Sequence, residues 1–376
     1  MGRLSDSPSP RVPARLRSRL APAAGLALAL GVLLVAAGPA SAVPRSFFGV
    51  SAVQPTPADF KQMSDLGIGT VRIEIAWGSV QPTRKSGYNW NAVDQRFRRA
   101  ATYGVRPQPI VFGSPPYISG GEYGRVVAPV DRKGHREAWK RFVTAAAERY
   151  GPGGTFWLTS PVLDGDLAPR NWIVWNEQNA RNFWHPKANP KEYATLLRIS
   201  RNAFDAAEPS IRITTGGMYG FPKKSTSLAA VKYLKKLYRE RGVARAVDAV
   251  SLHPYSSGVG GVKDQVKDAR KVIKRADPSA GIVIGEIGWA SGGQPKSNFL
   301  IKSRSRQRDL LERAYRLFLD NRGSWNIRSV YWFTFKDNRD AEVCIWCPKA
   351  GLVNEKGKLK PSGQAYRGLI ARHTGS

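Results

Sequence analysis

The stretch WIVWNE at residues 172–177 is a run of four apolar side chains that ends in asparagine and glutamate. A run without alternation of apolar and polar residues is typical of a strand buried on both faces, as in a parallel sheet covered by helices. A second run, GIVIGE at residues 281–286, has the same form and also ends in glutamate. Two such strands predict an α/β fold with acidic groups at the carboxyl ends of its strands.

Similar apolar runs recur through the chain after residue 43, at a mean spacing of roughly forty residues, with amphipathic stretches between them. The eight runs begin near Phe47, Thr70, Val105, Trp172, Ile211, Val247, Ile282 and Ser329. Eight strand–helix repeats over about 330 residues predict a single-domain (β/α)8 TIM barrel. The alternative is a doubly wound open sheet, but no glycine-rich phosphate loop follows the first strand.

The gaps between the runs carry helix signals. Thr56 followed by a proline predicts a helix start, and Gly67 predicts the end of the same helix. Asn189 before Pro190 predicts a second start. Residues 262–276 place apolar side chains on one face and lysine and arginine on the other, which predicts a helix covering the barrel.

The N-terminus has a different character. Four arginines within residues 11–19 precede an apolar run over residues 26–37, and small residues follow at 40–42. This order predicts a secretory signal peptide over residues 1–42 and one folded domain over residues 43–376. The alternative is an uncleaved membrane anchor, for which the apolar run is shorter than the ~20 residues that a span needs.

The chain is strongly basic, with a formal net charge of +31, of which residues 43–376 carry +27 because the leader holds five arginines and one aspartate. Such a charge favours anionic partners, which outside a cell include an acidic polysaccharide or an anionic cell surface. The alternative is a solubilising surface with no specific partner. No basic stretch is interleaved with aromatic residues, so we expect no specific nucleic-acid binding.

The only two cysteines, Cys344 and Cys347, lie three residues apart. In an exported chain, such a pair predicts a disulfide that stiffens a loop. A zinc site would need further ligands, and the four histidines show no ligand spacing. We therefore expect no metal and no organic cofactor.

In a (β/α)8 barrel, the residues just past each strand face one basin. This rule selects a short set of candidate site residues, namely Arg72, Asn176, Glu177, His253, Tyr255, Glu286 and Trp332. Aromatic faces suit the C–H faces of sugars. Trp184, Trp289 and Trp346 are therefore further candidates, with loop packing as the alternative for each.

These motifs resemble the clan A glycoside hydrolases, nearest in style to families 39 and 5, over about residues 46–370. Asn176-Glu177 is similar to that clan's acid/base motif, Glu286 to its nucleophile and Trp332 to its sugar platform. Arg72, His253 and Tyr255 sit where supporting groups of the family are expected. The chain departs from the family where Gln178 replaces a proline, which implies a loop of different shape.

The resemblance implies hydrolysis of β-linked glycosides with retention. Retention needs two carboxyl groups about 5 to 5.5 Å apart, one as nucleophile and one as acid. We expect Arg72 and Tyr255 to lower the pKa of Glu286, and burial to raise the pKa of Glu177. Asn176 is expected to hydrogen-bond the sugar 2-hydroxyl.

The sequence thus predicts a secreted retaining glycosidase, active as a monomer on a carbohydrate substrate and associated with the cell wall. An endo-acting enzyme on a polysaccharide, an acidic one included, is favoured over a small-substrate xylosidase. The alternatives are a carbohydrate-binding or polyanion-binding barrel without turnover, and a transglycosylase that uses the same covalent intermediate.

Overall fold

A computed structural model describes residues 42–121, 124–222, 225–338 and 344–375, and residues 1–41 of the predicted signal peptide lie outside these ranges. All eight predicted strands are present, and residues from Ala42 onward form one compact unit. The strands are β1 Phe48–Ser51, β2 Thr70–Ala76, β3 Arg106–Phe112, β4 Asn171–Val174, β5 Arg212–Thr215, β6 Met218–Tyr219, β7 Ala249–His253, β8 Gly281–Ile287 and β9 Ile327–Phe333.

The strands form a closed parallel barrel. Their order is β5-β4-β3-β2-β1-β9-β8-β7-β6, and a further pairing of Thr214 with Ala249 joins β5 to β7. Gly216 and Gly217 separate β5 from β6, so these two short segments share one position and the barrel has eight positions. Closure confirms the (β/α)8 prediction and excludes the doubly wound open sheet.

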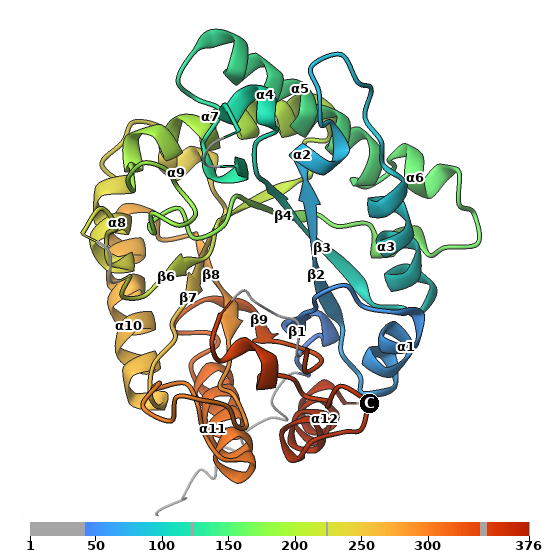
Figure 1. Cartoon of the computed structure of the whole chain (residues 1–376), viewed down its shortest axis with the longest axis vertical. Helices are drawn as coiled ribbons and strands as arrows, with labels where there is room; N and C mark the ends of the chain where they lie inside the picture. The colour runs from blue at the N-terminus through green and yellow to red at the C-terminus, as the bar shows by residue number, and fades with distance from the viewer. Residues whose placement is uncertain (1–41, 122–123, 223–224, 339–343, 376) are drawn as a thin grey trace, which may run out of the picture. The chain divides into compact units, whose positions relative to one another are not determined.

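Helices surround the barrel (Figure 1). They are α1 Pro57–Asp65, α2 Trp77–Val80, α3 Asn91–Thr102, α4 Pro116–Ser119, α5 Lys133–Tyr150, α6 Thr155–Leu158, α7 Pro190–Ala207, α8 Ala230–Leu237, α9 Val243–Ala246, α10 Val259–Ala276, α11 Arg304–Asp320 and α12 Pro361–Thr374. Within the described ranges, none of these helices is both long and apolar enough to cross a membrane.

The predicted helix boundaries are confirmed by their capping contacts. Thr56 accepts from the Asp59 backbone N–H, and the Asp59 carboxylate accepts from the Thr56 backbone N–H at 2.9 Å. Gly67 follows α1 with a left-handed φ of 77°, which favours glycine. Asn189 accepts from the Glu192 backbone N–H and so begins α7.

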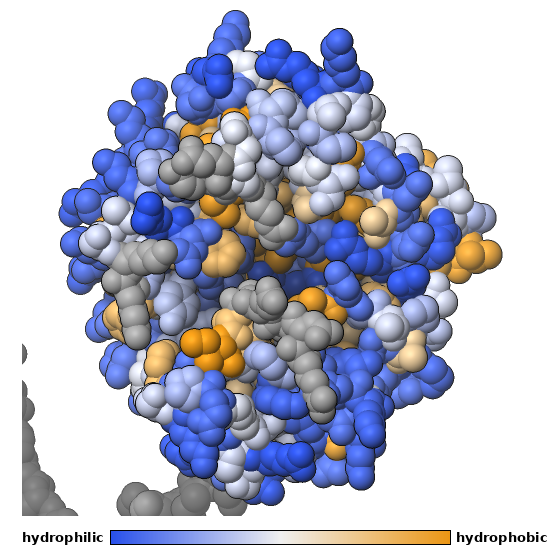
Figure 2. All heavy atoms as spheres, in the orientation of Figure 1, coloured by the Kyte–Doolittle hydropathy of each residue, from blue (hydrophilic) through white to orange (hydrophobic). Residues whose placement is uncertain are grey.

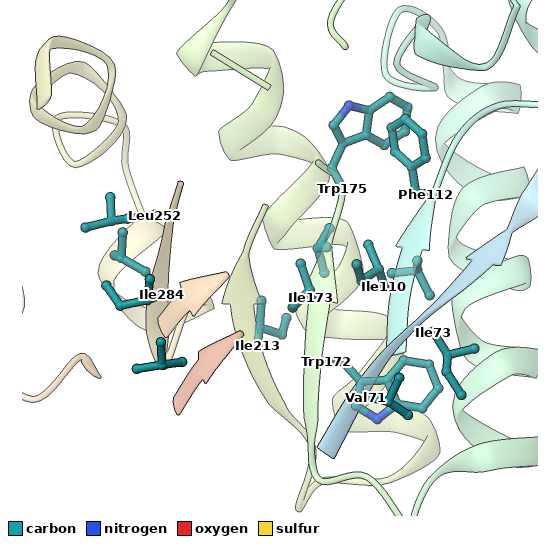
Figure 3. Close-up of a cluster of buried hydrophobic side chains, with 14 of the residues drawn as sticks. Val71, Ile73, Ile110, Phe112, Trp172, Ile173, Trp175, Ile213, Leu252 and Ile284 are labelled. Carbon is teal, nitrogen blue, oxygen red and sulfur yellow. The ribbon is translucent and has the colours of Figure 1, made fainter. Parts of the chain in front are cut away.

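The apolar runs form the core between the barrel and its helices. Figure 3 shows buried hydrophobic side chains carried by several strands, and Val71, Ile110, Ile173 and Ile213 are among those labelled. The fully buried Trp172 packs against Phe204 of α7, with ring centroids 5.3 Å apart. Burial of such side chains stabilises each by about 1.5 to 3 kcal/mol, and this rigid frame fixes the positions of the strand ends.

Candidate active site

Glu177 and Glu286 lie together at the carboxyl ends of their strands. Glu177 follows β4 by three residues, and Glu286 is the next-to-last residue of β8. One carboxylate oxygen of each glutamate and one ring nitrogen of His253 lie within 4.8 Å of one another. Each glutamate side chain is 14% exposed, so both are accessible from the barrel mouth.

Glu286 accepts hydrogen bonds from two predicted partners. Arg72 of β2 donates from Nη1 to Oε1 at 2.5 Å, and the Tyr255 hydroxyl donates to Oε2 at 2.8 Å. Burial alone would raise the pKa of Glu286. The attraction to His253 and Arg72, with the hydrogen bonds from Arg72 and Tyr255, outweighs burial and lowers this pKa. Glu286 is therefore held as a carboxylate.

Glu177 has the opposite environment. Burial raises its pKa and outweighs the hydrogen bond and attraction from His253, and the negative charge of Glu286 adds to the rise. The pKa values of these two neighbouring carboxyl groups are therefore shifted in opposite directions. This difference is what separates an acid from a nucleophile at one site.

His253 lies between the two glutamates. Its Nδ1 is 2.8 Å from Glu177 Oε1 and 3.4 Å from Glu286 Oε2. Its Nε2 is buried and has no hydrogen-bond partner among the described residues. Nδ1 is therefore the ring nitrogen through which His253 contacts the two glutamates.

Backbone conformation places both Glu177 and His253. Trp175 and Glu177 adopt left-handed φ values of 71° and 41°, a strained conformation that turns the chain sharply after β4. A Cβ on Gly217 would lie 1.8 Å from Nε2 of His253. Only glycine therefore leaves room for the imidazole at this position.

Gln178 and Asn179 form the loop at the point where the sequence departs from the family pattern. Gln178, in place of proline, is fully buried and donates from Nε2 to the Gly216 carbonyl at 3.0 Å. Asn179 is also buried and donates to the carbonyls of Tyr219 and Leu228. These two amides attach the Glu177 loop to the segment after β5.

A cavity of about 530 Å³ opens in front of the two glutamates. Asn176 lines it and accepts from Arg72 Nη2 at 3.4 Å. The rest of its lining is mainly apolar and aromatic, with a few polar groups that include Glu74, Arg181 and Asn182. Figure 2 shows a hollow in the middle of one face, with hydrophobic residues in its wall. Such a pocket suits a ligand with both hydroxyl and C–H surfaces.

The structure contradicts the prediction that three tryptophans contact sugar. Trp332, Trp289 and Trp184 are fully buried. Their indole N–H groups donate to the Ala350 carbonyl, the Ser256 carbonyl and the Glu192 carboxylate. Each tryptophan packs behind a strand or loop, so none lines the cavity.

Phe333 and Trp346 line the cavity instead, together with Phe183 and Tyr219. Phe333 follows Trp332, and neighbouring residues of a strand point to opposite faces. Because Trp332 packs on Trp289, Phe333 faces the cavity. Trp346 packs on Phe333 at 5.4 Å and on Tyr255 at 5.1 Å between ring centroids.

The predicted disulfide is present and borders the cavity. Cys344 and Cys347 are bonded, with their Cα atoms 5.2 Å apart. Both cysteines and the intervening Trp346 line the cavity. The bridge therefore restrains the loop that carries an aromatic wall of the site.

Glu177, His253 and Glu286 offer three ligand atoms at a spacing that a metal ion would accept. However, Arg72 and Tyr255 already occupy both oxygens of Glu286 with hydrogen bonds. The Arg72 guanidinium, whose Nη1 lies 2.5 Å from Glu286 Oε1, also repels a cation. The arrangement fits acid–base and nucleophilic chemistry better than metal binding.

No protein-family model and no curated protein matches this sequence. Solved structures do resemble it. A family 39 glycoside hydrolase from Bacteroides cellulosilyticus WH2 has a TM-score of 0.63 at 18% identity, over 87% of this chain and 63% of that one. A GH5_18 structure from Bifidobacterium longum subsp. infantis has a TM-score of 0.64 at 14% identity, over 88% and 80%.

The chain has the fold of glycoside hydrolase families 39 and 5. It spans less than two thirds of the family 39 enzyme. A further GH5_18 structure, from Bifidobacterium longum subsp. longum, holds Manβ1-4GlcNAc and has a TM-score of 0.62 at 16% identity, over 87% and 78%. The predicted resemblance is therefore confirmed at the level of fold.

Tyr255→Phe is expected to shift the acid limb of the pH profile of kcat/KM toward higher pH. The phenol hydrogen bond favours ionised Glu286, so its loss raises the pKa of Glu286. Hydrogen bonds to charged groups contribute about 1.5 to 3 kcal/mol, and kcat/KM below the optimum should fall about tenfold or more. The measurement is kcat/KM against pH on an aryl glycoside. An unchanged acid limb would contradict this role for Tyr255.

Proposed function

We propose that this protein is a retaining glycoside hydrolase that cleaves β-linked substrates by double displacement. The Glu286 carboxylate attacks the anomeric carbon while Glu177 donates a proton to the departing glycosidic oxygen. A covalent glycosyl-enzyme forms. Glu177, now a carboxylate, then removes a proton from water, which attacks the same carbon and releases Glu286 and the sugar.

The observation that carries this proposal is the pair of glutamates with opposite pKa shifts, whose nearest ligand atoms lie within 4.8 Å. Retaining enzymes hold their carboxyl groups about 5 to 5.5 Å apart, whereas inverting enzymes leave about 6.5 to 9.5 Å for a water. The short separation supports direct attack by Glu286. The fold likeness to families 39 and 5 supports the same reaction class.

Arg72 and Asn176 position the reacting groups in this scheme. Arg72 is 5% exposed and also donates to the Gly285 carbonyl at 2.8 Å, so its guanidinium is fixed before substrate enters. Its second nitrogen contacts Asn176, whose amide N–H groups can then face the sugar 2-hydroxyl. Contacts made before binding reduce the ordering cost of the transition state.

Secretion is part of the proposal, and it is supported by the leader pattern of residues 1–42 and by the disulfide. A β-linked polysaccharide is the substrate class that we favour. Support comes from the aromatic cavity wall, which suits stacked sugar rings, and from a solved neighbour that holds Manβ1-4GlcNAc. The double-displacement scheme uses side chains alone.

The deciding experiment is a panel of aryl glycosides and polysaccharides with the first-formed product anomer followed by NMR. We expect hydrolysis of a β-linked substrate to release the β anomer first. Release of the α anomer from that substrate would contradict the double-displacement mechanism. Transfer of the sugar to an added alcohol at the expense of hydrolysis would identify a transglycosylase instead.

A further inference from the structure

A second cavity, of about 830 Å³, lies at the amino-terminal ends of the strands. Thr70, Arg106, Asn171 and Arg212, the first residues of β2 to β5, all line it. On β2, Thr70 lines this cavity and Glu74 lines the catalytic one, four residues and roughly 13 Å farther along the strand. The two cavities therefore open at opposite ends of the barrel.

This amino-terminal cavity is rich in positive charge. Its lining contains five arginines and two aspartates, namely Arg106, Arg170, Arg212, Arg245, Arg328, Asp166 and Asp248. Asp248 is already engaged by Arg201 and Arg212. Clustered guanidinium groups without matching acids attract oxyanions and present paired donors to them.

Arg170 and Arg245 are the arginines most available to a ligand. Both are exposed, and neither has an ion pair or side-chain hydrogen bond within the part of the chain that the structure describes. Among the described residues, the Arg106 side chain has one hydrogen bond, to the Ala168 carbonyl at 3.0 Å, and burial lowers its pKa. An anion bound in the cavity beside Arg106 and Arg170 would reduce the repulsion between these two arginines.

The remaining lining indicates the kind of anion. Neutral polar groups of Asn171 and Ser279 also line the cavity, and the Ser279 hydroxyl, which donates to Asp277, can still accept from a sugar hydroxyl. The one aromatic residue of this lining, Tyr331, is 1% exposed, and its hydroxyl donates to Gln108 at 3.2 Å. Single-stranded nucleic acids need exposed aromatic faces for base stacking, so the cavity favours a glycan over a nucleic acid.

We infer that the amino-terminal cavity binds an acidic polysaccharide through the carboxylates of successive sugar units. Arg170 and Arg245 contact the carboxylates, and the neutral polar groups contact the sugar hydroxyls. The site lies away from the catalytic pocket, so it anchors the protein to an anionic glycan while the pocket stays free. This inference does not depend on the proposed hydrolysis.

The test is calorimetric titration of the full chain with an oligogalacturonate of about eight units, at about 20 mM and about 300 mM salt. The key variant is Arg170→Glu/Arg245→Glu. Its matched control is Lys235→Glu/Lys236→Glu, which makes the same charge change on the exposed face of α8. We expect the key variant to weaken binding about tenfold or more and the control less than about twofold.

Three results would overturn the inference. They are no binding by the unchanged protein, equal weakening by both double variants, and equally tight binding of a DNA single strand of the same charge. Turnover of a small aryl glycoside should be equal in all three proteins, because neither pair lines the catalytic pocket. Melting temperatures should also agree, and Arg170→Ser/Arg245→Ser should weaken binding by an intermediate factor.

Discussion

Replacement of Glu286 by glycine is expected to lower kcat/KM by about 10⁴-fold or more, because the covalent step loses its nucleophile. Azide can enter the space that the side chain leaves and attack the same face of the anomeric carbon. A β-linked aryl substrate should then give the α-glycosyl azide at a partly restored rate. The measurement combines the rate of phenol release with the anomer assigned by NMR.

Glu286→Gln is the matched variant for folding. Glutamine can still accept a hydrogen bond from Arg72. In the glycine variant, the Arg72 guanidinium, which is only 5% exposed, has lost its carboxylate partner. Removal of one partner of a buried pair costs about 3 to 5 kcal/mol. Both Glu286 variants should be inactive without azide. As a control, Glu148→Gln on the exposed face of α5 should be fully active. Activity above about 1% in the glutamine variant would contradict a nucleophilic role.

The barrel could be predicted because its signal is local. Strands buried on both faces are almost entirely apolar, so each of the eight runs stands out regardless of which face its residues occupy. The carboxyl-end rule then selected Arg72, Asn176, Glu177, His253, Tyr255 and Glu286, and these six side chains do converge. The barrel topology brings the strand ends that carry them to one rim.

Most of the aromatic wall could not be predicted by the same reasoning, although Trp346 was among the candidates. A strand places Trp332 and Phe333 on opposite faces, and a run that is apolar throughout does not reveal which face points inward. Trp332 packs outward against Trp289 at 6.1 Å, which leaves Phe333 at the cavity. Trp184 and Trp289 lie on loops, whose conformation depends on contacts such as the bond from Trp289 to Ser256.

The bridging position of His253 also depends on tertiary structure. The sequence placed it at a strand end, but its contact with Glu177 requires the absence of a side chain at Gly217 and the left-handed turn at Glu177. Neither condition follows from hydrophobic periodicity. The sign of both glutamate pKa shifts was nevertheless predictable, since Arg72 and Tyr255 approach Glu286 and burial acts on Glu177.

Replacement of Glu177 by glycine is expected to have an effect that depends on the leaving group. A positioned general acid contributes about 10² to 10⁴-fold. An alkyl or sugar leaving group needs this proton, so kcat/KM for such a substrate should fall by that factor. A dinitrophenolate leaves without protonation, and its kcat/KM should fall less than about tenfold.

The pH profile and azide provide independent readouts of the same variant. In the unchanged protein, kcat/KM should fall on the alkaline side as Glu177, whose pKa is raised, loses its proton. That limb should disappear in Glu177→Gly, while the acid limb set by Glu286 stays. Azide should now intercept the glycosyl-enzyme and give the β-glycosyl azide, the opposite anomer from the Glu286 variant. An equal loss for both leaving groups, or the α azide, would contradict the assignment. The leaving-group dependence and the β azide are the results that require Glu177, and not Glu286, to be the proton donor.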